Sequence, residues 1–160
     1  MTDLQTAIAT SIVVDAPVER AFAVFTEDMG SWWPEEHHIL QAPLARMVFE
    51  PAAGGEIYDV GTDGSECRWA RVLAYEPPHR IVFSWNISMQ WQIETDPAKA
   101  SEVEIRFTAE GPRTTLVELT HSKFERHGEG YQQLRAIFDG PGAWGDILAL
   151  YAKAAHGDRS

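Results

Sequence analysis

The stretch from Ile81 to Ile93 constrains the fold more than any other part of the sequence. In these 13 residues every odd-numbered position is apolar, and every even-numbered position except Val82 is polar. This period of two is typical of a β-strand with one buried and one solvated face. At about 3.3 Å per residue the stretch would extend about 43 Å, which is longer than most strands. We therefore expect the strand to bend or to leave the sheet.

The rest of the chain predicts a curved antiparallel sheet with a helix near each end. Residues 8–14 are rich in β-branched side chains, and residues 18–25 have apolar side chains at helical spacing. From residue 44 onward, about six short strands alternate with glycine- and proline-containing turns. Residues 142–156 again show helical spacing and predict a closing helix. The fold class is thus α+β, in a single domain over residues 1–160, with the closing helix covering the inner face of the sheet.

The composition bears on location and on the class of partner. The net charge of −11, with 13 scattered Lys and Arg residues, argues against nucleic acid and membrane surfaces as partners. The lone cysteine, Cys67, cannot form an internal disulfide. The sequence has no signal-peptide pattern and no apolar run of membrane-spanning length. A cytoplasmic location is therefore expected.

The segment GSWWPEEHHIL, residues 30–40, is rich in residue types that bind metals. Adjacent side chains diverge, however, and the spacing matches no standard zinc or calcium motif. The segment 121–127 also contains possible ligands in no standard pattern, and there is no serine nucleophile elbow or phosphate-binding loop. No metal and no cofactor are expected, and Cys67 is interpreted as a structural residue. A solvated loop is expected to contain Glu35, Glu36, His37 and His38.

His121 is the candidate for acid–base chemistry. It shares the inner face of a predicted strand with Val117 and Leu119, so it should point into the core. Two roles stay open: a hydrogen-bonded structural histidine, or a polar group that orients a ligand or acts as a general base. No other residue is assigned a catalytic role. The residues expected to contact a ligand are aromatic, polar-tipped or apolar inward-facing side chains: Trp33, Tyr58, Trp69, Phe83, Trp85, His121, Trp144 and Leu148.

Five segments carry a resemblance to a known family, and together they span nearly the whole chain in order. They are VVDAPVERAFAVFTEDMGSWWP, EPAAGGEIYDVGTDG, RVLAYEPPHRIVFSW, SEVEIRFTAEGPRTTLVELTH and GAWGDILALYAKAA. The chain resembles the START-like (SRPBCC) superfamily, in particular bacterial proteins similar to the C-terminal domain of the activator of heat-shock-protein ATPase. The resemblance implies a helix-grip fold, in which a curved sheet wraps around a long C-terminal helix over a hydrophobic cavity. It implies no particular reaction.

Three functions follow as hypotheses. The first is binding of a small, largely hydrophobic molecule in the cavity between the sheet and the closing helix. The second is a cyclase- or hydrolase-like enzyme that uses His121 in the same cavity. The third is a co-chaperone-like module that stimulates a chaperone ATPase. A homodimer is also expected, because an apolar half-strand that outruns its sheet needs cover; this half-strand contains Met89, Trp91 and Ile93.

Overall fold

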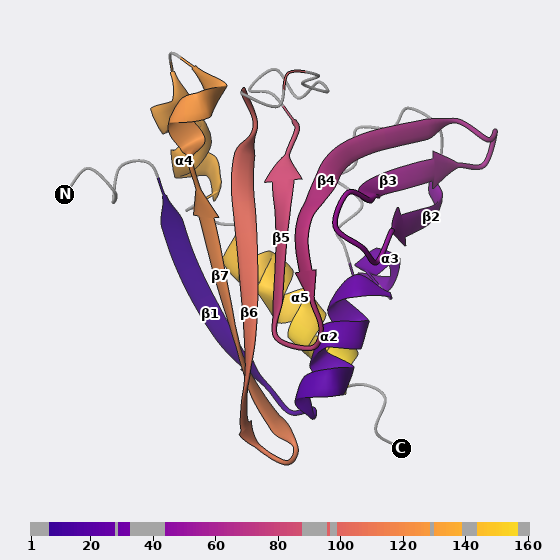
Figure 1. The fold of residues 1–160 in the computed structure, drawn as a ribbon, viewed down its shortest axis with the longest axis vertical. Coiled ribbons are helices and arrows are strands. Elements are labelled where there is room, and N and C mark those ends of the chain that lie inside the picture. Colours follow the sequence, from indigo (N-terminus) through magenta and orange to yellow (C-terminus); the bar gives the residue numbers. More distant parts are fainter. Residues whose placement is uncertain are drawn as a thin grey trace.

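The computed structural model describes residues 7–27, 29–32, 44–87, 96, 99–128, 130–138 and 144–156. Within these ranges a curved sheet forms one layer, and helices cover its concave face (Figure 1). The strands are β1 (Ile8–Val14), β2 (Leu44–Phe49), β3 (Glu56–Gly61), β4 (Glu66–Glu76), β5 (Arg80–Trp85), β6 (Ser101–Gly111) and β7 (Thr114–Ser122). The helices are α2 (Val18–Thr26), α3 (Met29–Trp32), the 3₁₀ helix η3 (Phe124–His127), α4 (Tyr131–Phe138) and α5 (Trp144–His156).

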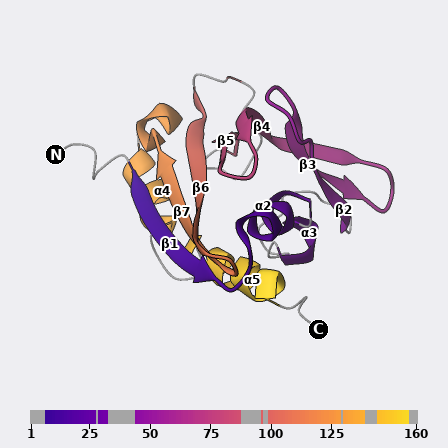
Figure 2. The same cartoon turned by 60° about the horizontal axis from the view of Figure 1, so that its bottom comes forward.

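The sheet is antiparallel throughout, in the order β1-β7-β6-β5-β4-β3-β2. It curls into an arc, and α2, α3 and α5 lie in the hollow of that arc (Figure 2). Irregular pairing accompanies this curvature: the register of β4 shifts against β3 beside Tyr58 and against β5 between Val72 and Ala74. Such bulges bend a strand and increase its twist. This arrangement is the α+β helix-grip fold expected from the sequence, so that prediction is confirmed.

The closing helix α5 grips the sheet because its apolar side chains follow the helical repeat. One stripe of the helix is almost fully buried, and it consists of Trp144, Ile147, Leu148, Tyr151, Ala152 and Ala155. The stripe belongs to the same buried cluster as inward-facing side chains of the strands, such as Phe83, Phe107 and Leu119. The predicted strand at residues 8–14 and the helix near residues 18–25 are also present.

The long alternating stretch is only partly a regular strand. The strand β5 ends at Trp85, and Ile87 forms an isolated bridge. Met89, Trp91 and Ile93 lie outside the described residues, so the homodimer through them stays a prediction. Three short helices had no clear signal in the sequence: α3, η3 and α4. Of these, η3 begins directly after Lys123, which has a left-handed backbone with φ of 64°.

One end of the core, next to α2, is built almost entirely from rings. We call it the aromatic end and define it by Phe22, Phe25, Trp32, Phe107 and Tyr151. The ring centroid of Phe25 lies 5.1 Å from those of Trp32 and Tyr151 and 5.8 Å from that of Phe107. Two polar tips at this end donate to backbone carbonyls of α2, namely Tyr151 Oη to Ala21 O at 2.6 Å and Trp32 Nε1 to Val24 O at 3.0 Å.

Candidate functional site

The opposite end of the core gathers polar side chains from three neighbouring strands. Trp85 ends β5, Ser101 begins β6, and the two are paired directly across the ladder. His121 near the end of β7 is paired with Val103, the next inward-facing position of β6. Ser101 and His121 are 0% exposed, and Trp85 is 1% exposed. Because the inner face of each strand points toward α5, the side chains meet Trp144 at the first turn of that helix.

Three of these side chains and one from η3 form a continuous chain of hydrogen bonds. The indole Nε1 of Trp144 donates to Nδ1 of His121 at 3.0 Å. Nε2 of His121 lies 2.7 Å from the hydroxyl oxygen of Ser101, and that oxygen lies 2.7 Å from Nε2 of His127 on η3. His127 is half-buried, so the chain runs from the core toward the surface. We call Trp85, Ser101, His121, His127 and Trp144 the polar end.

The donors in this chain can be assigned from elementary chemistry. An indole N–H can only donate, so Nδ1 of His121 must carry a lone pair. The proton of the neutral His121 ring is then on Nε2, from which it is donated to Ser101. The Ser101 hydroxyl donates its own proton to Nε2 of His127 when that nitrogen carries a lone pair, as it does in one tautomer of the neutral ring. With His127 in that tautomer, all three bonds point the same way, from Trp144 toward His127.

Burial keeps the His121 ring neutral. Desolvation lowers the pKa of His121 well below the usual 6.5, and the nearby His127 lowers it further. The ring also stacks on Phe124, with centroids 4.1 Å apart and planes 26° apart. Both nitrogens of His121 are engaged by Trp144 and Ser101. In this geometry His121 orients Ser101, and direct action as a base would require the bond from Trp144 to break.

Trp85 has an unusual position within the same cluster. Its ring centroid lies 5.0 to 5.8 Å from those of four other rings, which belong to Trp69, His121, Phe138 and Trp144. Among the buried side-chain nitrogen and oxygen atoms that the structure describes, only Nε1 of Trp85 has no hydrogen-bond partner. The indole N–H groups of Trp32, Trp69 and Trp144 all have acceptors. A buried donor without an acceptor costs about 1–3 kcal/mol, so this exception needs an explanation.

The structure brings most of the expected ligand-binding residues together. Phe83 and Leu148 are buried with Trp69, Trp85 and Trp144 in one cluster, and His121 contacts two of these indoles.

Two of the expected ligand-binding residues are not part of this group. Tyr58 is separate, because Ile57 and Asp59 take the inward positions of β3. The Tyr58 ring lies instead under Arg68, whose Cζ is 4.1 Å from the ring centroid. Trp33 lies outside the described residues, as do Glu35, Glu36, His37 and His38.

Sequence reasoning missed Ser101, His127 and Phe138. Ser101 carried a usable signal, since it stands two residues before Val103 and so continues the inward-facing positions of β6. His127 carried no such signal, because η3 brings it back over the end of β6 only after a left-handed turn at Lys123.

A small surface cavity adjoins the polar end. Its volume is about 180 Å³, below the 300–1,000 Å³ typical of pockets for drug-sized ligands. Phe138 and Trp144 stack with centroids 5.9 Å apart and separate this cavity from Trp85 and His121. The lining consists of Ile8, Ala9, Thr10, Phe138, Trp144, Gly145 and Asp146.

The described part of the chain holds neither a metal-binding cluster nor an ionised thiol. Within the described ranges, no group of three or more His, Cys, Asp or Glu side chains could hold a metal ion. Burial raises the pKa of the Cys67 thiol to about 11, with a further contribution from Asp59, so the thiol is protonated at neutral pH. No helix in the described part of the chain has the length and apolar character needed to cross a membrane.

Comparisons with known proteins give a family and several structural neighbours. The family model for Activator of Hsp90 ATPase homolog 1-like proteins matches residues 15–139. No curated protein matches the sequence at a significant level. A solved structure of the anthrahydroquino-γ-pyrone synthase Txn09, complexed with SUM, is 39% identical. It has a TM-score of 0.66, and the match covers 93% of this chain and 96% of that one.

Two further solved structures share the fold at lower identity. The protein NE0264 from Nitrosomonas europaea is 13% identical, with a TM-score of 0.69 and 98% of both chains covered. The self-sacrificing resistance protein CalC from Micromonospora echinospora is 23% identical, with a TM-score of 0.64. That match covers 97% of this chain and 99% of CalC.

Proposed function

The chain belongs to the family of Activator of Hsp90 ATPase homolog 1-like proteins, and from this premise we propose that it binds a small, largely hydrophobic aromatic molecule at the polar end of its core. The observation that carries the proposal is the unpartnered Nε1–H of Trp85 within a cage of four rings. Rings favour a flat apolar body, and a free donor favours an acceptor oxygen on that body. A ligand with both features would supply the hydrogen bond that Trp85 lacks.

The chemical class of the ligand can be narrowed further. The 39% identical structure bears the name of an anthrahydroquino-γ-pyrone synthase, and that name describes fused rings with a ring carbonyl. A γ-pyrone or quinone carbonyl accepts a hydrogen bond in the plane of its ring system. We therefore take fused-ring pyrones and quinones as the ligand class for this protein.

Two probes of equal shape test the proposal. Chromone is a benzo-γ-pyrone, and naphthalene has the same fused-ring outline without the oxygen acceptor. Calorimetric titration should show that chromone binds about tenfold more tightly, which corresponds to one hydrogen bond of about 1.4 kcal/mol. The indole N–H signal of Trp85 in a ¹H–¹⁵N spectrum should shift on addition of chromone. Failure of both probes to bind would refute the proposal.

Single-ring substitutions locate the contact. Trp85→Phe keeps an aromatic ring but removes the N–H group, so the preference for chromone over naphthalene should disappear. Trp69→Phe is the matched control, because the N–H of Trp69 already donates to Oδ1 of Asp59 at 3.3 Å. This control should keep the preference for chromone. If Trp85→Phe also keeps it, the acceptor of the ligand does not lie at Trp85.

A ring-closing enzyme is the second candidate, and the 39% identity to a named synthase favours it. Such an enzyme would use the same ligand site and would need proton transfer at the polar end. Prolonged incubation distinguishes the candidates: an enzyme converts a linear precursor of a γ-pyrone into the ring in amounts exceeding the protein, whereas a binding protein returns it unchanged. Stimulation of a chaperone ATPase stays a prediction.

A further inference from the structure

We propose that Ser101 and His127, oriented by His121, form a proton outlet for the ligand site. An acidic hydroxyl of a bound ligand gives its proton to Oγ of Ser101 while the Ser101 hydroxyl proton moves to Nε2 of His127. The inference rests on the proposed function, since it needs a ligand next to Trp85. It goes further by selecting ligands with a phenolic or enolic hydroxyl, held as the anion.

The register of the sheet places the Trp85 donor next to Ser101, the first residue of the outlet. Trp85 and Ser101 are directly opposite on neighbouring strands, where inward-facing side chains are separated by about 5 Å at Cβ. A fused-ring ligand spans more than this distance, so one molecule can accept from Trp85 and offer a hydroxyl to Ser101. His127 is half-buried at the far side of Ser101, which gives the proton a route toward water.

The direction of transfer is fixed by the bond from Trp144. Because the Trp144 N–H occupies Nδ1 of His121, the His121 ring keeps its proton on Nε2 and cannot accept another from Ser101. His127 is therefore the acceptor that remains for the Ser101 proton. His121 donates to Oγ of Ser101 throughout, and this bond stabilises the negative charge that develops there during the transfer.

The step balances without any co-reactant. The O–H bond of the ligand breaks and a new O–H bond forms on Ser101, while the original O–H bond of Ser101 breaks and an N–H bond forms on His127. The ligand keeps the electron pair as an oxyanion, and the imidazolium of His127 releases its proton to water. Serine is regenerated in the same step.

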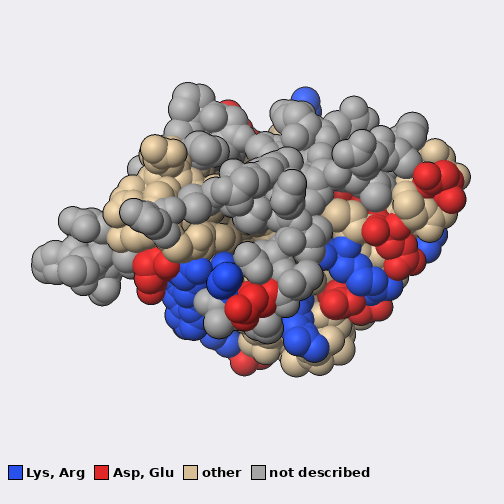
Figure 3. Space-filling view, turned by 90° about the horizontal axis from the view of Figure 1, so that it is seen from above, with Lys and Arg blue, Asp and Glu red and all other residues tan. Residues whose placement is uncertain are grey.

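Two basic side chains near His127 in the sequence share one carboxylate partner. Glu102 on the outer face of β6 accepts from Lys123 at 3.2 Å and from Arg126 at 3.3 Å. Glu125 on η3 is exposed to solvent, and the ring that faces Ser101 from β7 is the neutral His121. Seen from above this end, basic and acidic side chains are interspersed over the described surface (Figure 3). Glu102, the acidic side chain of β6 at this end, therefore already has two basic partners.

An ionisable probe tests the outlet directly. The compound 7-hydroxychromone keeps the γ-pyrone carbonyl and carries a hydroxyl whose ionisation shifts its near-ultraviolet absorption to longer wavelength. We expect the bound probe to ionise about one pH unit lower than in water, because His127 takes up the proton nearby. In His127→Gln the shift should vanish while binding persists, since glutamine still accepts from Ser101 but takes up no proton.

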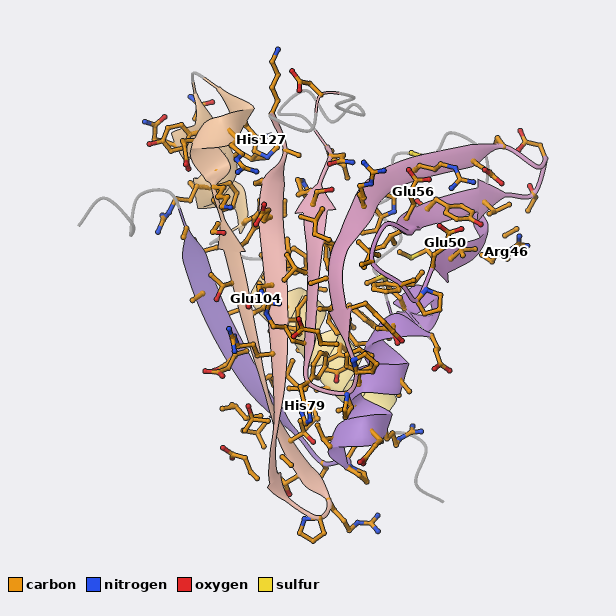
Figure 4. All side chains as sticks on the ribbon, in the orientation of Figure 1. Arg46, Glu50, Glu56, His79, Glu104 and His127 are labelled. Carbon is orange, nitrogen blue, oxygen red and sulfur yellow. The ribbon has the colours of Figure 1, made fainter. Side chains whose placement is uncertain are left out.

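His79→Gln is the matched control. His79 is exposed, and it lies in the turn between β4 and β5 at the opposite end of the sheet from His127 (Figure 4). Bound to this variant, the probe should ionise at the same pH as when it is bound to the unchanged protein. If His127→Gln leaves the shift intact, the outlet is overturned and the proposed ligand site stands. If 7-hydroxychromone does not bind at all, both proposals fall.

A measurement without ligand provides a second, independent test of the proton outlet. Long-range ¹H–¹⁵N spectra distinguish the two neutral tautomers of histidine. They should show His121 protonated on Nε2 at neutral pH, with the ring held in that form by Trp144. Protonation on Nδ1 would reverse the chain of donors and overturn the outlet.

Discussion

The two ends of the core are built from the same sheet and the same helix, yet they satisfy their polar atoms differently. At the aromatic end, Trp32 and Tyr151 donate to backbone carbonyls of α2. At the polar end, Trp144, His121, Ser101 and His127 bond to one another through side chains, and Trp85 has a free N–H.

The two kinds of hydrogen-bond partner suit different roles, one in stability and one in function. A backbone carbonyl neither gains nor loses a proton near neutral pH, so bonds to it only hold the fold. Imidazole and hydroxyl groups can exchange protons and change partners. We therefore expect substitutions at the aromatic end to affect stability alone, whereas substitutions at the polar end should also alter pH dependence and ligand preference.

The largest expected effect is a loss of stability at the aromatic end. Phe25→Ala removes a ring that packs against Trp32, Phe107 and Tyr151, and it should lower the free energy of unfolding by about 3–5 kcal/mol. Urea unfolding measures this loss. Val13→Ala is the control, because Val13 is 51% exposed and should change stability by less than about 0.5 kcal/mol.

The same variant tests whether the two ends are independent. The folded fraction of Phe25→Ala should bind chromone with unchanged affinity, since no ring at the polar end is altered. A parallel loss of affinity would show that the two ends are coupled, which would remove the basis of the comparison.

A pair of identical substitutions gives the next largest effect. Trp144→Phe and Trp85→Phe remove the same atoms, but only Trp144 uses its N–H, in the bond to Nδ1 of His121. Trp144→Phe leaves that buried acceptor without a partner and should therefore cost about 1–3 kcal/mol more stability than Trp85→Phe. Urea unfolding of both variants measures the difference. Equal losses would mean that the bond from Trp144 to His121 contributes nothing.

Stability should also depend on pH through the polar end. The pKa of His121 is lower in the folded protein than in the unfolded chain, so the unfolded chain binds more protons as the pH falls below about 6.5. The contribution of neutral His121 is fully present above that pH and is lost below it, with a slope approaching about 1.4 kcal/mol per pH unit.

Substitution of His121 tests this slope. His121→Gln cannot titrate, and its urea unfolding between about pH 5 and pH 7 should depend less steeply on pH than that of the unchanged protein. His79→Gln serves as the control and should leave the slope as it is, because His79 is exposed in the turn between β4 and β5. A slope that persists in His121→Gln would assign the pH dependence to another group.

The sequence predicted the architecture well because periodicity encodes which face of an element is buried. The stripe Trp144, Ile147, Leu148 and Tyr151 and the inward-facing residues of β6 could both be identified from it. The hydrogen-bond chain could not be predicted in the same way. It depends on the left-handed turn at Lys123, a conformation that lysine seldom adopts, so the residue type gave no warning of it.

The candidate ligand residues show the same limit. Trp69, Trp85 and Trp144 are buried together, but residue type alone could not separate the free N–H of Trp85 from the two satisfied ones. That distinction depends on distances of about 3 Å, which side-chain packing sets and periodicity does not. Tyr58 was included for its amphipathic side chain, although strand alternation puts it on the face that Arg68 covers.

The smallest expected effect compares one buried hydroxyl at each end. Tyr151→Phe removes a donor to Ala21 O and should cost about 1 kcal/mol. Burial raises the pKa of Tyr151 far above its usual value, so the phenol stays neutral and this loss should be the same at about pH 5 and pH 8. Ser101→Ala removes the hydroxyl between His121 and His127, and its loss of stability should change over the same interval. Urea unfolding at both pH values measures the two losses of stability. If the loss for Tyr151→Phe varies with pH, or the loss for Ser101→Ala stays constant, proton exchange does not distinguish the two ends of the core.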